Sequence, residues 1–216
     1  MTIKEYFKDW LPLIDTNELY KALSKINKNN ICPEYNNIFR AFNLCDYRNC
    51  KVICIGQDPY PQKSVATGIA FGNKPDVIEL SPSLEVIKES VINFEIPHNL
   101  ITFDQTLEDW EKQGVLMLNS SLTCEVNKVG SHSMIWRPFI AKFLQNMTTT
   151  GIIYVLFGKQ AQSFKPYINT KFNDIIEVQH PAYFARTNTA MPNIFNKINN
   201  LVYNKYKEKI NWYYES

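Results

Sequence analysis

Four short apolar runs, separated by amphipathic stretches, constrain the fold of this chain more than any other feature of its sequence. The runs have the length of buried strands and lie at residues 52–55, 115–118, 152–157 and 175–178. Helical patterns cover the region up to about residue 48 and residues 83–91, 107–112 and 193–206. This alternation is typical of a parallel sheet with crossover helices. Because no internal repeat or linker-like segment interrupts it, the sequence predicts an α/β fold in which residues 1–216 form a single domain, with a central four-stranded parallel sheet flanked by helices.

Length and charge allow an enzyme without identifying one. The 216 residues can bury a sizeable core, and the hydrophobic content of 45% agrees with a globular fold. A formal charge of +2 is only mildly basic, so any contact with nucleic acid has to come from a local patch. No apolar stretch approaches the ~20 residues that span a bilayer, and residues 1–10 carry acids and aromatics where a secretion signal has an apolar core. We therefore expect no membrane partner and a cytoplasmic protein, or a nuclear one if the source is eukaryotic.

The cysteines favour structural thiols over a metal centre or a disulfide framework. Their number, five, is odd, and they are scattered along the chain. Cys45, Cys50 and Cys54 are close enough in sequence to suggest a metal or iron-sulfur site, but they form no CxxC pair and Cys54 lies inside a predicted strand. We expect reduced, buried thiols and no metal site.

The first apolar run ends in the stiff, polar and aromatic segment Gly56-Gln57-Asp58-Pro59-Tyr60-Pro61. Pro59 pushes Asp58 toward extended backbone angles, and the two prolines fix their own φ on either side of Tyr60. A carboxylate and an aromatic ring are therefore held in fixed directions. The alternative is that Asp-Pro only initiates a turn, which is its commonest use.

Each of the other predicted strands also delivers a distinctive group at its carboxyl end. Asn119 follows the second run, Gly158 and Lys159 the third, and His180 the fourth. The carboxyl ends of parallel strands form the ligand crevice of an open α/β sheet, so these groups are expected to converge. Individually each has a structural alternative: Asn119 could satisfy loop backbone, His180 could be packed, and for Lys159 a solvated position at a helix start is the favoured interpretation.

Taken together, these motifs resemble the family 1 uracil-DNA glycosylases. The motifs stand in the family's order: Gly-Gln-Asp-Pro-Tyr at 56–60, Gly68 and Phe71 beyond it, Ser-Pro-Ser-Leu at 81–84, Leu-Met-Leu-Asn at 116–119, and His180-Pro181. Asp58 sets the chain apart from the thymine/mismatch and iron-sulfur branches, which typically carry Asn or Glu there. The resemblance implies a uracil-DNA glycosylase-like fold and a monofunctional enzyme of base excision repair. Such an enzyme hydrolyses the N-glycosidic bond of deoxyuridine in single- or double-stranded DNA, releasing uracil and leaving an abasic site.

The resemblance also implies roles for the residues of the base site, with no metal and no cofactor. Positive charge develops on the sugar and negative charge on the uracil as the bond breaks. Asp58 would stabilise the sugar cation and position the attacking water, and His180 would donate to uracil O2. The implied base contacts are Asn119 with the O4 and N3 edge, Tyr60 in the space of a thymine methyl, Phe71 stacked on the ring, and Gln57 through main-chain or side-chain contacts. For Phe71, ordinary core packing stays an alternative.

Other residues are implied to hold DNA, because flipping a base out of the duplex costs a few kcal/mol that contacts to the flanking strand must recover. The implied contacts to the DNA backbone come from Ser81, Pro82 and Ser83, and a second phosphate contact comes from Gly158 and Lys159. Family members usually continue after the His-Pro motif with Ser-Pro-Leu, the leucine wedging into the gap that the flipped base leaves. This chain has Ala182-Tyr183-Phe184 instead, which predicts Phe184 as the wedge, with Arg186 or Lys197 compensating at the backbone.

Two further positions carry smaller expectations. Pro61 stands where many members have a histidine, a departure that bears on the rate rather than on the reaction. His132 also resembles a family position, and we interpret it as structural.

The expected partner is uracil-containing DNA, bound by a monomer. Whether a DNA-mimicking inhibitor protein also binds, and whether single or double strands are preferred, is left open by the sequence. The competing hypothesis is a noncatalytic DNA-binding or replication-accessory protein on the same fold, since fold does not dictate activity. Against it stand Asp58, Asn119 and His180, for which such a module has no chemical need.

Overall fold

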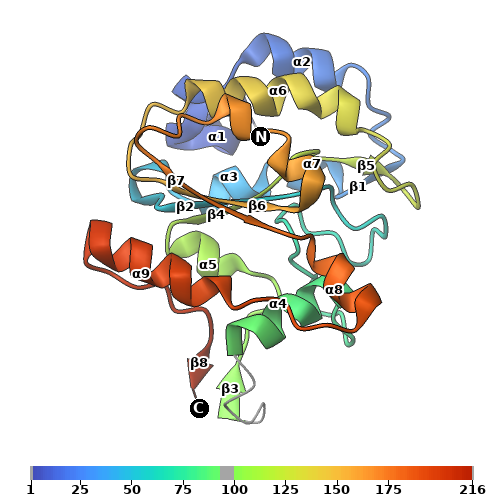
Figure 1. Ribbon diagram of the computed structural model, residues 1–216. Coiled ribbons are helices and arrows are strands. Elements are labelled where there is room, and N and C mark those ends of the chain that lie inside the picture. The colour runs from blue at the N-terminus through green and yellow to red at the C-terminus, as the bar shows by residue number, and fades with distance from the viewer. Residues whose placement is uncertain (1, 93–99, 216) are drawn as a thin grey trace.

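The centre of the molecule is a parallel sheet of four strands, seen in a computed structural model that describes residues 2–92 and 100–215 (Figure 1). The strand order is β4-β2-β6-β7. The bounds are Val52–Gly56 for β2, Val115–Asn119 for β4, Ile153–Phe157 for β6 and Asp174–Val178 for β7. The predicted fold class and all four predicted strands are confirmed, with each boundary within one residue. All neighbouring pairs are parallel, so the four carboxyl ends lie along one edge of the sheet.

Helices cover both faces of this sheet. One face carries α1 (Ile3–Phe7), α2 (Thr16–Leu23), α3 (Arg40–Leu44) and α6 (Ser133–Asn146). The other carries α4 (Pro82–Ile92), α5 (Glu108–Lys112), α8 (Pro181–Thr187) and α9 (Ile194–Tyr206), while α7 (Gly158–Gln162) follows β6 directly. Figure 1 shows α2 and α6 above the sheet and α4, α5 and α9 below it. The layered arrangement explains why the strands are apolar on both sides.

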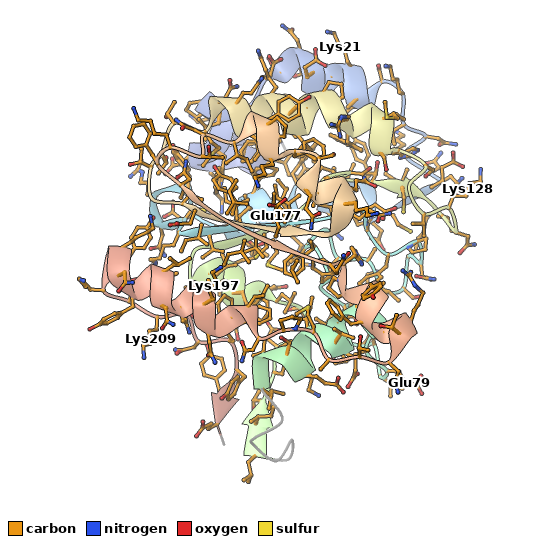
Figure 2. All side chains as sticks on the ribbon, viewed as in Figure 1. Lys21, Glu79, Lys128, Glu177, Lys197 and Lys209 are labelled. Carbon is orange, nitrogen blue, oxygen red and sulfur yellow. The ribbon has the colours of Figure 1, made fainter. Side chains whose placement is uncertain are left out.

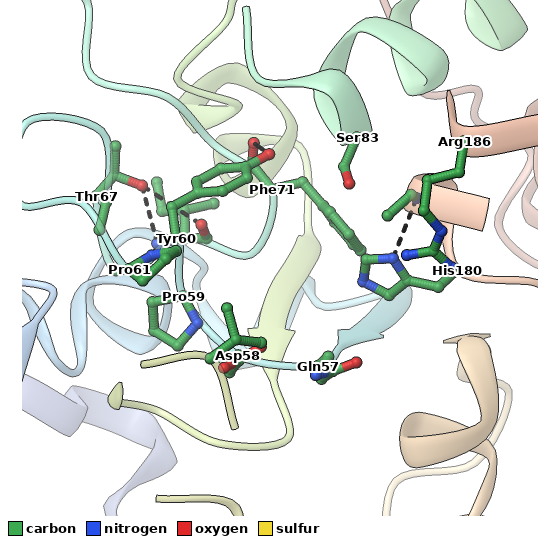
Figure 3. A pocket seen from close by; sticks show the side chains of 15 residues that line it. Gln57, Asp58, Pro59, Tyr60, Pro61, Thr67, Phe71, Ser83, His180 and Arg186 are labelled. Carbon is green, nitrogen blue, oxygen red and sulfur yellow. Dashed lines mark hydrogen bonds between the residues drawn. The ribbon is translucent and has the colours of Figure 1, made fainter. Parts of the chain in front are cut away.

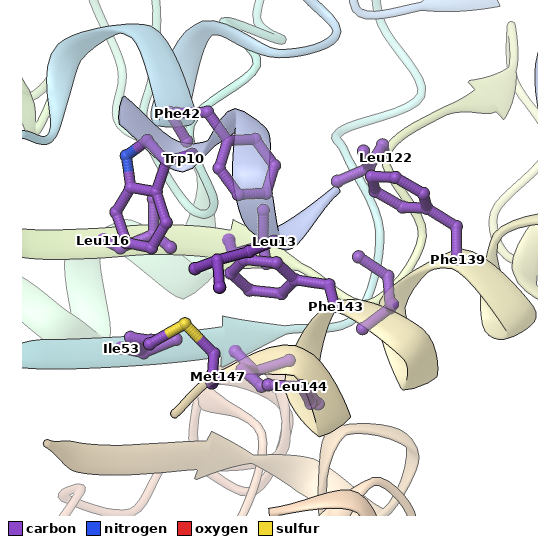
Figure 4. Packing of buried hydrophobic residues seen from close by; sticks show 14 of the residues in the cluster. Trp10, Leu13, Phe42, Ile53, Leu116, Leu122, Phe139, Phe143, Leu144 and Met147 are labelled. Atoms are coloured by element: carbon purple, nitrogen blue, oxygen red, sulfur yellow. The ribbon is translucent and has the colours of Figure 1, made fainter. Parts of the chain in front are cut away.

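Alternation along each strand divides the core into two clusters. In β2, Ile53 and Ile55 face one cluster and Val52 and Cys54 face the other. The first cluster contains Trp10, Phe42 and Phe143, whose rings pack over the sheet beside Leu116 and Ile53 (Figure 4). The second is built on Trp110, Phe195 and Trp212, which contact one another edge to face or tilted. Both faces are therefore sealed by aromatic packing.

Short elements complete the chain. The 3₁₀ helices are η1 (Lys8–Leu13), η2 (Tyr35–Asn37), η3 (Tyr47–Asn49) and η5 (Lys165–Tyr167). Two antiparallel pairs join β1 (Ile31–Cys32) to β5 (Cys124–Glu125) and β3 (Ile101–Thr102) to β8 (Tyr214–Glu215). None of the helices within 2–92 and 100–215 has the length and apolar character that crossing a membrane requires.

The helix predictions differ from the structure in several places, among them the short helices α7 and α8, which were not predicted. The region before residue 48 is a series of short helices interrupted by β1, because Pro12 and Pro33 break the pattern. The third predicted helix loses its first residue, since Leu107 has a left-handed backbone and α5 begins at Glu108. The long helix α6 was not predicted, although Trp136, Phe139, Ile140 and Phe143 follow helical spacing, because Pro138 lies inside it.

The cysteine predictions can be compared with the structure residue by residue. All five thiols are free and buried, and Cys54 lies within β2 as predicted. Burial raises the pKa of the Cys54 and Cys124 thiols, that of Cys124 to about 12, so neither is a thiolate at neutral pH. Among the described residues, no three His, Cys, Asp or Glu side chains are grouped as metal ligands.

Candidate active site

A cavity of about 360 Å³ opens where the strands end (Figure 3). Its walls come from the loop after β2, the turn around Phe71, the start of α4 and the start of α8. Of the predicted site residues, the structure brings these to the cavity wall: Gln57, Asp58, Tyr60, Phe71, Ser83, His180 and Arg186. Residues separated by more than 120 positions in the sequence thus face one space. Of the four predicted strand ends, those of β2 and β7 supply lining residues, namely Gln57, Asp58 and His180, whereas Asn119 at the end of β4 and Lys159 after β6 do not line the cavity.

Asp58 lies half-buried at the cavity and is held by the backbone of a distant loop. Its Oδ2 accepts a hydrogen bond from the Gly130 N–H at 2.5 Å. Burial raises the pKa of the Asp58 carboxyl above its ordinary value, while the hydrogen bonds from Gly130 and from the Gln57 side chain oppose that rise. The result is a carboxylate that is only partly hydrated and that is fixed in orientation. Gly130 gives no signal in the sequence, because it lies 72 residues away.

Gly56, the last residue of β2, is packed so closely that a side chain would not fit there. Gly56 pairs in register with Asn119, the last residue of β4. A Cβ on Gly56 would lie 2.7 Å from the Asn119 Oδ1 and 3.2 Å from the Phe71 Cζ. Asn119 is 6% exposed, and neither Asn119 nor Gly56 is among the lining residues, although Phe71 is. Glycine at this position therefore leaves room for the Asn119 amide and for an aromatic ring that lines the cavity.

Phe71 and Tyr60 are fixed by contacts to each other and to the core. Phe71 has a left-handed backbone (φ 65°), and its ring contacts Phe157 edge to face at 5.1 Å between centroids and His180 at 5.6 Å. The Tyr60 hydroxyl donates to the Phe71 carbonyl at 3.1 Å. Phe71 packs in the core, as its structural interpretation anticipates, and it also lines the cavity; stacking on a base stays a prediction.

His180 caps the N-terminus of α8 and presents a fixed tautomer. Its Nδ1 accepts a hydrogen bond from the Ala182 N–H at 3.2 Å, so in the neutral ring the proton is carried by Nε2. Burial and, second, the Arg186 guanidinium lower the pKa of His180 to about 4. Gly158 makes room for this ring, because a Cβ there would lie 2.8 Å from the His180 Cβ. The site therefore offers a neutral imidazole as a hydrogen-bond donor.

We expect the His180 imidazole to stay neutral where an ordinary histidine gains its proton. Its folded-state pKa of about 4 lies below the unfolded value of 6.5, so the unfolded chain binds more protons between these values. The contribution of His180 to stability is therefore complete above pH 6.5 and is lost as the pH falls toward 4. An NMR titration of ¹⁵N-labelled imidazoles, assigned with a His180→Gln variant, measures the pKa and the tautomer. A midpoint near 6.5 contradicts the prediction.

Arg186→Gln is the companion variant for this titration. Removing the guanidinium is expected to raise the pKa of His180 but to leave it below 6.5, because burial is the larger cause. Lys159→Gln is the matched control, since Lys159 is exposed, also follows a strand and does not line the cavity. It should leave the His180 titration unchanged.

The remaining predicted site residues lie around the cavity and not in it. Ser81 is partly exposed and Pro82 is exposed at the start of α4, and Lys159 is exposed on α7, as its solvated interpretation anticipates. Gly158 is buried against His180. Figure 2 shows Lys197 on α9, apart from α8, which carries Arg186 (Figure 1); of the two cations predicted to compensate, only Arg186 lines the cavity.

The predicted wedge is not at the surface. Phe184 is 9% exposed and belongs to the core cluster beneath α8, whereas its neighbour Tyr183 is 44% exposed. On a helix, adjacent residues point about 100° apart, so burying one of the pair exposes the other. His132, interpreted as structural, is buried with its Nδ1 2.8 Å from the Thr123 Oγ1, which confirms that interpretation.

Comparisons with known proteins agree with this geometry. The family described as Uracil DNA glycosylase superfamily matches residues 42–202. A uracil-DNA glycosylase of Mycoplasmopsis pulmonis is 35% identical, over 97% of this chain and 91% of its own. The crystal structure of mimivirus uracil-DNA glycosylase has a TM-score of 0.75 at 23% identity, covering 97% of this chain and 91% of that one. A variant of that viral protein in complex with UGI has a TM-score of 0.74 at 22% identity, with 97% and 93% covered.

Proposed function

Because the chain belongs to the uracil-DNA glycosylase superfamily, we propose that it hydrolyses the N-glycosidic bond of deoxyuridine in single- or double-stranded DNA, as the first step of base excision repair. The observation that carries the proposal is the placement of the Asp58 carboxylate and a neutral, Nε2-protonated His180 in the wall of one cavity. The reaction separates charge, and these two groups suit its two poles.

In the proposed reaction the bond between C1′ of the sugar and N1 of uracil breaks, and its electron pair stays on the base. The Asp58 carboxylate stabilises the cationic sugar and orients the water whose oxygen bonds to C1′. The His180 Nε2–H donates a hydrogen bond to uracil O2, where negative charge develops. A neutral imidazole suits this role because its N–H can bind the anion without transferring a full proton. No other group of the chain has to react.

Base recognition would depend on the side chains packed around Gly56 and on the aromatic residues of the cavity. The Asn119 amide can pair with the O4 and N3 edge of uracil, whereas cytosine presents the opposite polarity and would leave buried groups unpaired. Phe71 would stack on the ring. Tyr60, fixed by its hydrogen bond to the Phe71 carbonyl, would occupy the space that the methyl of thymine needs. Gln57 lines the cavity and adds contacts to the pyrimidine.

DNA would lie across the segments that border the cavity. Ser83 is 7% exposed, lines the cavity and has no hydrogen-bond partner for its hydroxyl among residues 2–92 and 100–215. It suits a phosphate oxygen at the start of α4, together with Ser81 and Pro82. Gly158, Lys159 and Arg186 would supply further backbone contacts. Since the described conformation buries Phe184, we assign the wedge to Tyr183. A DNA-mimicking inhibitor such as UGI would compete for the same face.

Release of free uracil from a single-uracil oligonucleotide, in single-strand and duplex form, tests the proposed function. We expect release from both forms and none from a matched thymine oligonucleotide. Binding without release would instead favour the noncatalytic accessory protein. Release from the thymine control would contradict the role given to Tyr60.

A further inference from the structure

Asn73 lies fully buried between the cavity and the start of α4. Its Oδ1 accepts a hydrogen bond from the Ser81 N–H at 2.8 Å, and its Nδ2 donates to the Ser81 Oγ at 2.8 Å. Its own N–H donates to the Gln105 carbonyl at 2.8 Å. The Asn73 amide therefore hydrogen-bonds to both the backbone and the side chain of Ser81 and fixes the position of that serine.

The backbone around Asn73 belongs to the cavity wall. Phe71 stands two residues before it, and Asn73 forms an antiparallel bridge with Ala66, another lining residue. The Tyr60 hydroxyl donates to the Phe71 carbonyl, so the same segment also holds a second ring of the cavity wall.

The hydrogen bonds to Asn73 keep the Ser81 hydroxyl from capping the N-terminus of α4. Ser81 directly precedes α4, and its carbonyl accepts the first bonds of the helix, from the N–H groups of Leu84 at 2.8 Å and Glu85 at 3.0 Å. A serine in this position usually turns its hydroxyl onto the N–H of the second or third helical residue. Here the hydroxyl accepts a hydrogen bond from Asn73 instead, so the N–H of Ser83 is left open beside the unpartnered Ser83 hydroxyl.

We propose that Asn73 is a positioning residue for DNA: by holding Ser81 away from the end of α4, it keeps the Ser83 N–H and hydroxyl available for a phosphate oxygen of the bound strand. The inference rests on the proposed function. It concerns the affinity for the DNA backbone and leaves the base contacts unchanged, because Asn73 reaches the cavity only through the segment it braces.

The test is Asn73→Val, which removes both side-chain hydrogen bonds with little change in shape. We expect kcat/KM on uracil-containing duplex to fall about tenfold, mostly through a rise in KM. The negative slope of log(kcat/KM) against log[salt] should become shallower by about 1, as for one lost phosphate contact. Inhibition by free uracil, which probes the cavity alone, should change less than twofold.

Asn199→Val is the matched control. Asn199 makes the same two-bond clamp, accepting from the Ile210 N–H at 2.8 Å and donating to the Ile210 carbonyl at 3.0 Å, but it lies on α9. It should lower the thermal midpoint without changing the salt slope. Adding Asn73→Val to a Ser83→Ala background should lower kcat/KM little further, because the two residues act on one phosphate contact.

Equal losses of DNA turnover and of free-uracil affinity in Asn73→Val would overturn the inference, as would an unchanged salt slope. If Asn73→Val does not fold, Ser83→Ala replaces it. That variant loses the hydroxyl that Asn73 is proposed to keep available, and an unchanged KM for DNA would then overturn the inference. A wild-type protein that releases no uracil contradicts the proposed function itself, which is a separate outcome.

Discussion

Asp58→Asn is expected to lower the turnover of uracil-containing DNA by about 10²- to 10⁴-fold while leaving DNA binding largely intact. Asparagine has the same shape, and its amide oxygen can still accept the Gly130 N–H. What disappears is the negative charge that, in the proposed reaction, stabilises the cationic sugar and orients the water. Because this charge acts in the transition state more than in the substrate complex, kcat should fall and KM should not rise. Single-turnover kinetics and a gel-shift titration measure the two separately.

Asp174→Asn is the matched control for this variant. Asp174 is the first residue of β7, at the edge of the sheet opposite the cavity, and its carboxylate pairs with the Lys205 ammonium at 2.9 Å. The same change of carboxylate to amide should leave turnover within about twofold, since a surface ion pair contributes little. A mild effect of Asp58→Asn, comparable to that of the control, would mean that another group positions the water.

The sheet was predictable because its physical signal is local. A parallel strand buried on both faces is an uninterrupted apolar run, so β2 and β4 can be located to within a residue. Helix α6 shows the limit of such patterns. Its Pro138 reads as a break, yet the apolar spacing around it continues and tertiary packing against Trp10 and Phe42 holds the helix together.

The site was predictable where a functional group stands at the end of a strand. Asp58 and His180 could be placed because parallel strands bring their carboxyl ends together, although Asn119 and Lys159, at the other two strand ends, do not line the cavity. Gly130 and Asn73 could not be placed from the sequence. Gly130 contacts a partner far along the chain, and Asn73 acts within a loop that has no periodic pattern. Gly56 belongs to the first motif, but only the register of β2 with β4 explains why a glycine is needed at that position.

The Tyr183-Phe184 pair shows why motif alignment alone does not assign a side chain to a surface. Sequence position made Phe184 the counterpart of the family's leucine. In the structure the segment is helical, and α8 packs on the second core cluster through Phe184, whose ring contacts Tyr183 edge to face at 5.4 Å. The Tyr183 N–H donates to the His180 carbonyl at 2.8 Å, so the residue with the exposed ring belongs to the same turn as His180.

Phe184→Ala is therefore expected to lower the free energy of unfolding by about 3 to 5 kcal/mol, the range for deleting a buried phenylalanine. Tyr183→Ala should change that free energy by no more than about 0.5 kcal/mol, because its ring is 44% exposed. Its effect should appear in activity instead. If Tyr183 fills the gap left by the flipped base, loss of one base-stacking contact should lower kcat/KM on duplex DNA about tenfold or more, and on single strands far less.

Urea denaturation and the ratio of duplex to single-strand activity together decide between the two aromatic residues. Tyr203→Ala is the control, because Tyr203 is a similarly exposed tyrosine, 49%, on α9 and away from the cavity. It should leave both the stability and the activity ratio unchanged. Phe184 would regain the wedge role if its removal left the unfolding free energy unchanged and lowered duplex activity selectively, since its ring would then have to leave the core when DNA binds. We expect Phe184→Ala to lose stability with an unchanged ratio of duplex to single-strand activity, and Tyr183→Ala to keep its stability with a lower ratio. That outcome would assign the contact with DNA to the exposed Tyr183 ring and the anchoring of α8 to the buried Phe184 ring.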